Sequence, residues 1–180
     1  MQLFNKHVAT LLATMCYAVF CTPTLAQEIN ADTELALASE LDRHGSMSSA
    51  NIANIFQAGN LNQIGAQQYG VSNYLVTSQE GQRNFLLVTQ SGGQNFTVSS
   101  QTGQANIAAL VQIGYENLIL LQQNGYGNDA NISQYGFQNS ATVKQVGAFN
   151  EVSIYQSGSG LNTEVTQKGV ALTTTIRQYD

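Results

Sequence analysis

Carboxamide side chains recur along this chain at a fixed spacing, and a carboxamide donates and accepts hydrogen bonds without acid–base chemistry. Glutamines stand 11 residues apart, at Gln57, Gln68, Gln79, Gln90, Gln101, Gln112, Gln123, Gln134, Gln145, Gln156, Gln167 and Gln178. A glycine stands two residues after all but the last of them, at Gly59, Gly70, Gly81, Gly92, Gly103, Gly114, Gly125, Gly136, Gly147, Gly158 and Gly169. The asparagines share the period, at Asn51, Asn62, Asn73, Asn84, Asn95, Asn106, Asn117, Asn128, Asn139 and Asn150. The repeated chemistry is therefore hydrogen bonding.

Groups that could catalyse a reaction are few and scattered. His44 lies in a polar segment before the repeats, where we interpret it as a solvated linker residue. The repeats carry isolated acids that fit gatekeepers against aggregation better than a hydrolytic carboxylate pair, namely Glu80, Glu116, Asp129, Glu151 and Glu164. The glycines match neither a phosphate loop nor a calcium-binding nonapeptide. We therefore predict a non-enzymatic protein with no catalytic residue, metal site or cofactor.

The elements that position the carboxamides are predicted to be short strands. From each asparagine, residues alternate with period two, so that Asn106, Ala108, Leu110 and Gln112 share one face. This pattern predicts a seven-residue strand with an inner face of Asn, apolar, apolar and Gln. The four residues between Gln and the next Asn contain the glycine, which can take a positive φ and reverse the chain. A right-handed helical supercoil also has an 11-residue period, but glycine and asparagine in every unit disfavour helices.

Two successive repeat units would make one strand–turn–strand rung. Rungs stacked about 4.8 Å apart place like residues above like. We expect an all-β solenoid of about six rungs with two facing, parallel, in-register sheets. An antiparallel meander is the alternative, but its single sheet would leave one face without a partner layer.

Stacked carboxamides would satisfy one another in ladders and fix the register of the strands. The terminal rungs would then carry unpaired backbone groups and half-satisfied amides, and the repeats contain no proline to block them. We expect these edges to act by adding strands from other chains.

The N-terminal residues match a secretory signal peptide, because Lys6 and His7 precede an apolar run and a small-residue ending at Ala26. We divide the chain into a signal peptide at 1–26, a flexible polar segment at 27–45 and a repeat domain at 46–180. Cys16 and Cys21 both lie in the first segment, so the mature chain would hold no disulfide. A lipid anchor is disfavoured, because Met15 and Phe20 are poor residues before a modified cysteine.

Charge and hydropathy exclude other classes of function. Beyond residue 26 the chain carries 11 acidic and five basic residues without a basic cluster, which disfavours nucleic-acid binding. No later segment approaches about 18 uninterrupted apolar residues, so we do not expect a membrane-spanning helix. A monomeric ligand-binding solenoid, for ice or sugar, is a rival function, but it would need a regular outward array that this chain lacks.

The unit from Gln134 to Gln145, with the pattern Gln-x-Gly-x-x-Asn-x-Ala-x-x-x-Gln, resembles the curlin repeat of bacterial curli fibres. The resemblance covers roughly residues 46 to 178. It implies a secreted subunit of extracellular, cell-surface functional amyloid, which acts in adhesion and biofilm matrix. It also implies partners, namely the major curlin subunit, other copies of this chain, and the curli secretion pore with its accessory factors.

Within that family the chain is more similar to the minor subunit, which nucleates the fibre, than to the major one. Residues 27–45 are acidic and contain leucines rather than a glycine-rich leader. Leu161 and Leu172 replace asparagine in the last two units, where Lys168 and Arg177 add positive charge. The resemblance links such basic repeats to surface attachment. The ending Gln178–Tyr179 is similar to that of major subunits, which keeps the major subunit as the alternative.

Outward positions are expected to carry an apolar band. Its residues are Tyr74, Val76, Phe85, Leu87, Phe96, Val98, Ile107, Leu118 and Leu120. One hypothesis is a docking surface for another curli component or the outer membrane. Lateral bundling of fibres, or β-propensity alone, is the other interpretation.

Overall fold

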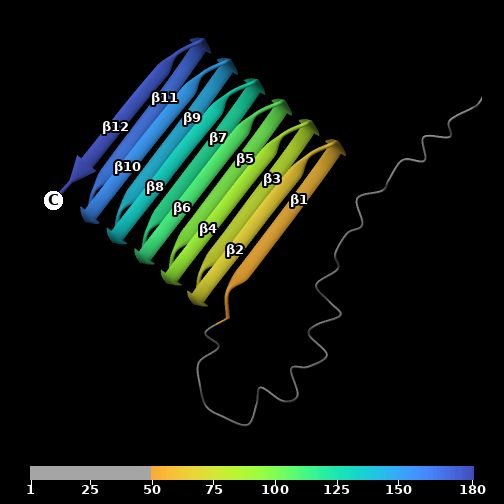
Figure 1. Ribbon diagram of the computed structural model, residues 1–180. Coiled ribbons are helices and arrows are strands. Elements are labelled where there is room, and N and C mark those ends of the chain that lie inside the picture. The colour runs from red at the N-terminus through yellow and green to blue at the C-terminus, as the bar shows by residue number, and fades with distance from the viewer. Residues whose placement is uncertain (1–49) are drawn as a thin grey trace, which may run out of the picture. The chain divides into compact units, whose positions relative to one another are not determined.

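The computed structural model describes residues 50–180 (Figure 1). The predicted signal peptide (1–26), the polar segment (27–45) with His44, and the first residues of the repeat domain lie outside the described residues. They remain predictions from sequence.

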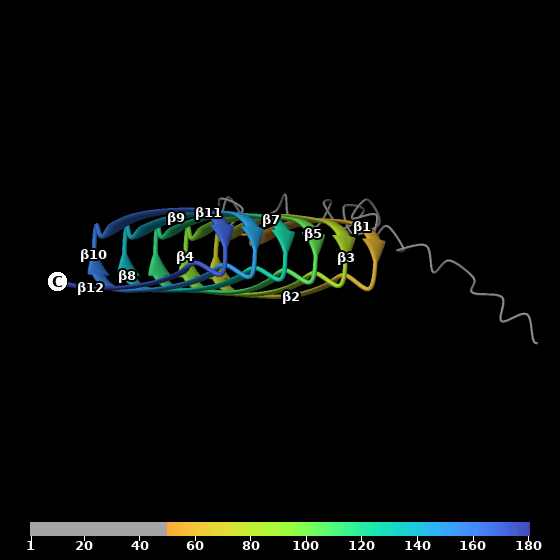
Figure 2. The same cartoon turned by 90° about the horizontal axis from the view of Figure 1, so that it is seen from above.

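Twelve strands form two six-stranded parallel sheets, and consecutive strands alternate between them (Figure 1). The odd sheet contains β1 (Ile52–Asn60), β3 (Tyr74–Gln82), β5 (Phe96–Gln104), β7 (Leu118–Tyr126), β9 (Ser140–Ala148) and β11 (Asn162–Val170). The even sheet contains β2 (Gln63–Val71), β4 (Phe85–Gly93), β6 (Ile107–Tyr115), β8 (Asp129–Phe137), β10 (Glu151–Ser159) and β12 (Thr173–Tyr179). The turned view shows the two sheets as facing layers (Figure 2). The predicted six-rung solenoid is therefore confirmed, and the meander is wrong.

Each strand from β1 to β10 pairs in register with the strand two repeat units further along the chain. Gln57 lies beside Gln79, and Gly59 lies beside Gly81. The same pairing continues to the last strand, where Gln156 lies beside Gln178. Because paired residues are two repeat units apart, residues from the same position of the repeat lie beside one another along the stack. We call each such row of equivalent residues a column.

The strands are longer than the sequence analysis predicted, and the chain reverses later. β6 contains nine residues, begins one residue after Asn106 and includes Gly114. The left-handed residue of each turn lies two positions beyond the glycine, as at Leu61 (φ 57°), Arg83 (φ 56°) and Glu116 (φ 55°). The repeated glycines do have positive φ, as predicted, but they lie within the strand ends rather than at the reversal.

Close stacking of the backbone explains why glycine is required there. Gly114 has φ 126°, a conformation that side-chain-bearing residues rarely adopt. A Cβ atom added to it would overlap the carbonyl oxygen of Gly136, the glycine above it in the column. The same overlap recurs from Gly59 to Gly147. Glycine is thus fixed by the column, whereas the left-handed turn residues can vary.

The core lies between the two sheets and is filled by small and medium apolar residues. Leu75, Leu86, Ala108, Ile119 and Ile132 have no exposed surface. Their inward direction follows the predicted alternation, because each lies two or four residues before the buried glutamine of its strand. This packing positions the carboxamide columns along both margins of the apolar core.

Candidate functional site

The glutamines form two continuous ladders, one in each sheet. In each ladder, the Nε2 of one glutamine donates to the Oε1 of the glutamine two units later, at 2.6–3.0 Å. The glutamines from Gln79 to Gln156 have no exposed surface. The structure therefore brings together all twelve glutamines that the sequence analysis proposed as ladder residues.

Each ladder glutamine from Gln68 to Gln178 also bonds across to the opposite sheet, which the sequence analysis missed. Gln112 Nε2, in the even sheet, donates to the backbone oxygen of Phe96 in the odd sheet at 3.3 Å. Gln123 Nε2 donates in the other direction, to the backbone oxygen of Ile107 at 2.8 Å. Gln134 Nε2 likewise donates to the backbone oxygen of Leu118, and in all three bonds the donor and acceptor are 16 residues apart in the sequence. The glutamine columns therefore hold the two sheets together.

The asparagines form ladders of the opposite polarity. Asn84 Oδ1 accepts from the backbone N–H of Asn106 at 3.1 Å and from its Nδ2 at 3.0 Å. Asn106 Nδ2 donates in addition to the carbonyl oxygen of Gly125 at 3.2 Å. Donation in this ladder thus runs toward β1, whereas donation in the glutamine ladders runs toward β12. The carbonyl of each column glycine from Gly70 to Gly169 is also engaged by this network.

These bonds explain how so many carboxamides are tolerated in the interior. A buried amide without partners would cost about 1 to 3 kcal/mol. In the part of the chain that the structure describes, the only buried side-chain N or O atoms without a partner are the hydroxyl oxygens of Thr77 and Ser99. Every interior ladder residue is therefore satisfied by its neighbours above and below.

Among residues 50–180, no strand covers the β1–β2 end of the stack. On the inner face, Ala53 is exposed and Ile55 is 47% exposed, although the corresponding residues of β3 are buried. Gln57 and Gln68 each donate to the next glutamine. No group within residues 50–180 donates to the Oε1 atom of either. This end thus presents free acceptors above a partly exposed core.

The β11–β12 end is more closed. Val165 and Gln167 on β11 are only 7% and 4% exposed. The asparagine ladders stop at Asn139 and Asn150, whose Oδ1 atoms accept from the backbone N–H groups of Leu161 and Leu172. The Asp180 carboxylate accepts from the backbone N–H of Ser159 at 2.8 Å. The two ends of one stack therefore differ in chemistry.

The structure does not bring together the two cations proposed for surface attachment. Lys168 lies on β11 of the odd sheet and Arg177 lies on β12 of the even sheet, and both are exposed. They are on the same terminal rung but in different sheets. Any common role would therefore need a partner that contacts both sheets.

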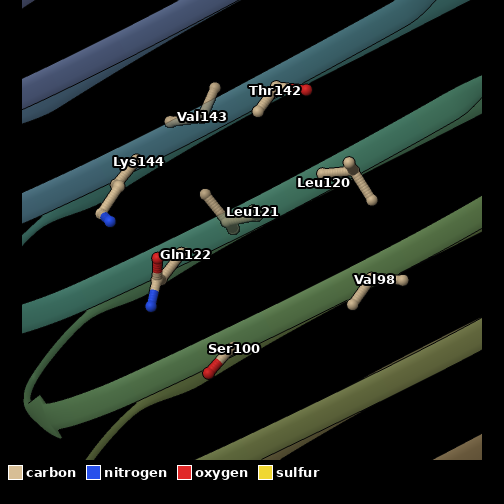
Figure 3. A pocket seen from close by; sticks show the side chains of 8 residues that line it. All are labelled: Val98, Ser100, Leu120, Leu121, Gln122, Thr142, Val143 and Lys144. Atoms are coloured by element: carbon tan, nitrogen blue, oxygen red, sulfur yellow. The ribbon is translucent and has the colours of Figure 1, made fainter.

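The outer faces carry the predicted apolar band, which is partly exposed. Phe85, Leu87 and Ile107 are 39–46% exposed, and the rings of Tyr74 and Phe96 stack with centroids 5.1 Å apart. A shallow hollow of about 300 Å³ crosses β5, β7 and β9 on the odd sheet (Figure 3). Its wall contains Val98 and Leu120, while Lys144 lies at its β9 margin. The rest of its lining is Ser100, Leu121, Gln122, Thr142 and Val143.

The structure pairs two of the acidic residues, Asp129 and Glu151, which the sequence analysis treated as isolated. Glu116 accepts a hydrogen bond from Gln138 Nε2 at 2.7 Å on an exposed turn. Asp129 and Glu151 are neighbours in register on β8 and β10. Burial, and then the like charge of Glu151, raise the pKa of Asp129 above its ordinary value of 3.8. Within residues 50–180, no three His, Cys, Asp or Glu side chains gather to hold a metal ion.

No helix of sufficient length and apolar character to cross a membrane is found among residues 50–180.

No curated protein matches the chain. Residues 114–147 and 138–169 match the family model of the curlin associated repeat. The matched stretch runs from the end of β6 to β11 and has the in-register glutamine columns described above. This part of the chain, residues 114–169, is therefore similar to the curlin associated repeat.

Proposed function

We propose that this chain is a secreted subunit of extracellular curli fibres that nucleates polymerisation of the major curlin at the cell surface. The observation that carries the proposal is the open β1–β2 end, where free glutamine acceptors lie beside exposed inner-face residues. Such an end is a template on which an incoming repeat can complete both backbone and side-chain ladders.

Templating addresses the slow step of amyloid assembly. A disordered chain must order a whole rung before it gains the bonds and burial that a neighbouring rung provides. A preformed rung supplies that neighbour from the start, in the required register. A small amount of this protein would therefore remove most of the lag before fibres grow.

Several sequence features support the nucleating role over that of the bulk subunit. Leu161 and Leu172 interrupt the asparagine ladders in the last rung, where a uniform fibre subunit would benefit from continuing them. We propose that Lys168 and Arg177 attach the same rung to an anionic component of the cell surface. The division into a signal peptide (1–26), a polar segment (27–45) and the repeat domain (46–180) belongs to this proposal, as does export through the curli pore.

A seeding experiment tests the proposal. The purified mature chain is added at about one part in fifty to freshly unfolded major curlin, and amyloid-dye fluorescence is followed. We expect the lag to shorten at least several-fold, because templating replaces spontaneous nucleation. An unchanged lag would exclude nucleation and leave the alternative of a major subunit. That alternative predicts that this chain alone forms long fibres and responds to a separate nucleator.

A further inference from the structure

We propose that the β1–β2 end is the templating end, and that the chain which docks there is a curlin-type repeat with an intact asparagine ladder rather than a second copy of this chain. The inference rests on the proposed function and specifies its active end and its partner. β1 and β12 lie at opposite ends of the stack, so the two ends can be tested separately (Figure 1).

The polarity of the ladders defines what the open end lacks. Gln57 Oε1 and Gln68 Oε1 need N–H donors, because glutamine donation runs toward β12. The backbone N–H groups of Asn51 and Asn62 need Oδ1 acceptors, because every later asparagine donates its N–H to the Oδ1 of the asparagine one rung earlier. An incoming rung must therefore bring two glutamine amides and two asparagine oxygens.

This chain's own preceding residues cannot provide those groups. One rung, or two repeat units, before Gln57 and Gln68 the sequence has Leu35 and Ser46. At the same distance before Asn51 and Asn62 it has Ile29 and Glu40. Neither set supplies a carboxamide, so the preceding sequence does not continue the ladders in the register of the repeat, whereas a repeat from another chain can.

The column glycines add a steric requirement. A Cβ atom on a column glycine would overlap the carbonyl oxygen of the glycine beside it in the next rung. A rung docked on β1 and β2 must therefore place glycines beside Gly59 and Gly70. The strands stack in parallel and in register, so that each rung is followed by the next rung in the sequence. The rung of an incoming chain that contacts β1 and β2 is therefore its C-terminal rung.

The β11–β12 rung of a second copy does not meet these requirements. Leu161 and Leu172 stand where Oδ1 acceptors are needed for Asn51 and Asn62. Asp180 stands one rung after Gly158, at a position where the column requires glycine. Its carboxylate is already engaged with the backbone N–H of Ser159. The same features make the β11–β12 end a poor template, since the next rung would find no asparagine oxygens there.

A peptide-binding experiment tests both parts of the inference. The probe is a labelled, freshly dissolved peptide of residues 95–116, which contains one odd and one even strand with Asn95 and Asn106 in place. We expect it to bind the full mature chain, and we expect the N95L/N106L peptide to bind about tenfold more weakly, because two N–H groups lose their acceptors. Equal binding of the two peptides would overturn the predicted partner chemistry.

Substitutions at the two ends identify the site. Ala53→Lys places an inward charge on exposed β1, whereas Thr174→Lys does the same on β12. We expect about a tenfold loss of peptide binding for Ala53→Lys, no loss for Thr174→Lys, and none for Asn54→Lys, the matched outward control on β1. Circular dichroism confirms that each variant folds. Equal losses for Ala53→Lys and Thr174→Lys, or a loss only for Thr174→Lys, would overturn the assignment.

The peptide assay is independent of fibre formation, so the two proposals can fail separately. Peptide binding at β1 without any shortening of the major curlin lag would refute the nucleating role and leave the docking site standing. A shortened lag that Ala53→Lys does not change would refute the docking site and leave nucleation standing.

Discussion

The inner and outer faces of the same twelve strands follow different rules. On the inner face, one column contains glutamine in every strand, and the next inward columns contain mainly small or medium apolar residues. On the outer face of the odd sheet, a single column passes from Val76 through Val98 and Leu120 to Thr142 and Glu164. Stacking in register therefore fixes only those positions that must bond or pack along the axis.

The outer face is also unequal along the stack. Strands β3 to β7 carry the apolar band, whereas β8 and β10 carry Asp129, Asn131, Glu151 and Ser153 at equivalent positions. Each outward residue contacts solvent on one side, so a charge costs little there. Substitutions that break the inner pattern should therefore have much larger effects than those on the outer face.

The largest effect is expected from Gly114→Ala. The added Cβ would overlap the carbonyl oxygen of Gly136, and φ 126° is strained for alanine, so we expect a loss of at least about 4 kcal/mol and local loss of stacking. Gly160→Ala is the matched control, because φ 70° lies in the left-handed region that non-glycine residues occupy at other turns, and no atom lies within 4 Å of the new Cβ. Urea unfolding measures both variants. Similar losses in the two would show that backbone stacking does not require the column glycine.

The next largest effect is expected from Gln112→Ala. Gln112 Oε1 accepts from Gln90 Nε2 and Thr97 Oγ1, and its Nε2 donates to Gln134. Removing it leaves buried groups without partners, so we expect a loss of about 3 kcal/mol in the free energy of unfolding. The outward Gln122→Ala should change stability by less than about 0.5 kcal/mol. If both glutamines prove equally tolerant in urea unfolding, the buried ladder contributes little.

The contrast between the faces also explains what could be predicted from sequence. The rung architecture and the inner residues followed from the 11-residue period, because stacking forces the same residue type into each column. The left-handed turn residues gave no such signal, since Leu61, Arg83 and Glu116 share no side-chain property. The polarity of the ladders was also hidden, because a carboxamide carries both donor and acceptor and only the packing decides which points along the axis.

The apolar band provides a smaller and more informative test. Phe96→Ser removes a ring stacked on Tyr74, which should cost about 1 kcal/mol, because the ring is already 37% exposed. A triple variant with Phe85→Ser, Phe96→Ser and Leu118→Ser should keep its fold by circular dichroism. Its attachment to cells and its lateral bundling, compared with the unsubstituted chain by electron microscopy, separate the two interpretations of the band. Unaltered attachment would exclude docking, and unaltered bundling would exclude lateral contact.

The smallest effect on stability is expected from the outward acids. The ionised Asp129 carboxylate should lower the free energy of unfolding, whereas a stabilising ion pair would raise it. The folded state raises the pKa of Asp129 through burial and then through Glu151, so the folded chain binds its proton more tightly than the unfolded chain does. The resulting loss in the free energy of unfolding is absent below the unfolded pKa, near 3.8, and is complete once the pH exceeds the raised folded pKa. Stability should therefore decline slightly as the pH rises through this window. We expect Asp129→Asn to flatten this decline, and urea unfolding midpoints measured from acidic to neutral pH would show it.

Glu164→Gln is the matched control, because Glu164 lies outward in register with Thr142 and no acid is paired with it there. If the stability of the Asp129→Asn variant declines with pH as much as that of the unsubstituted chain, the pH dependence belongs to other groups. That result would also show that two outward charges can lie side by side on adjacent strands without a measurable loss of stability.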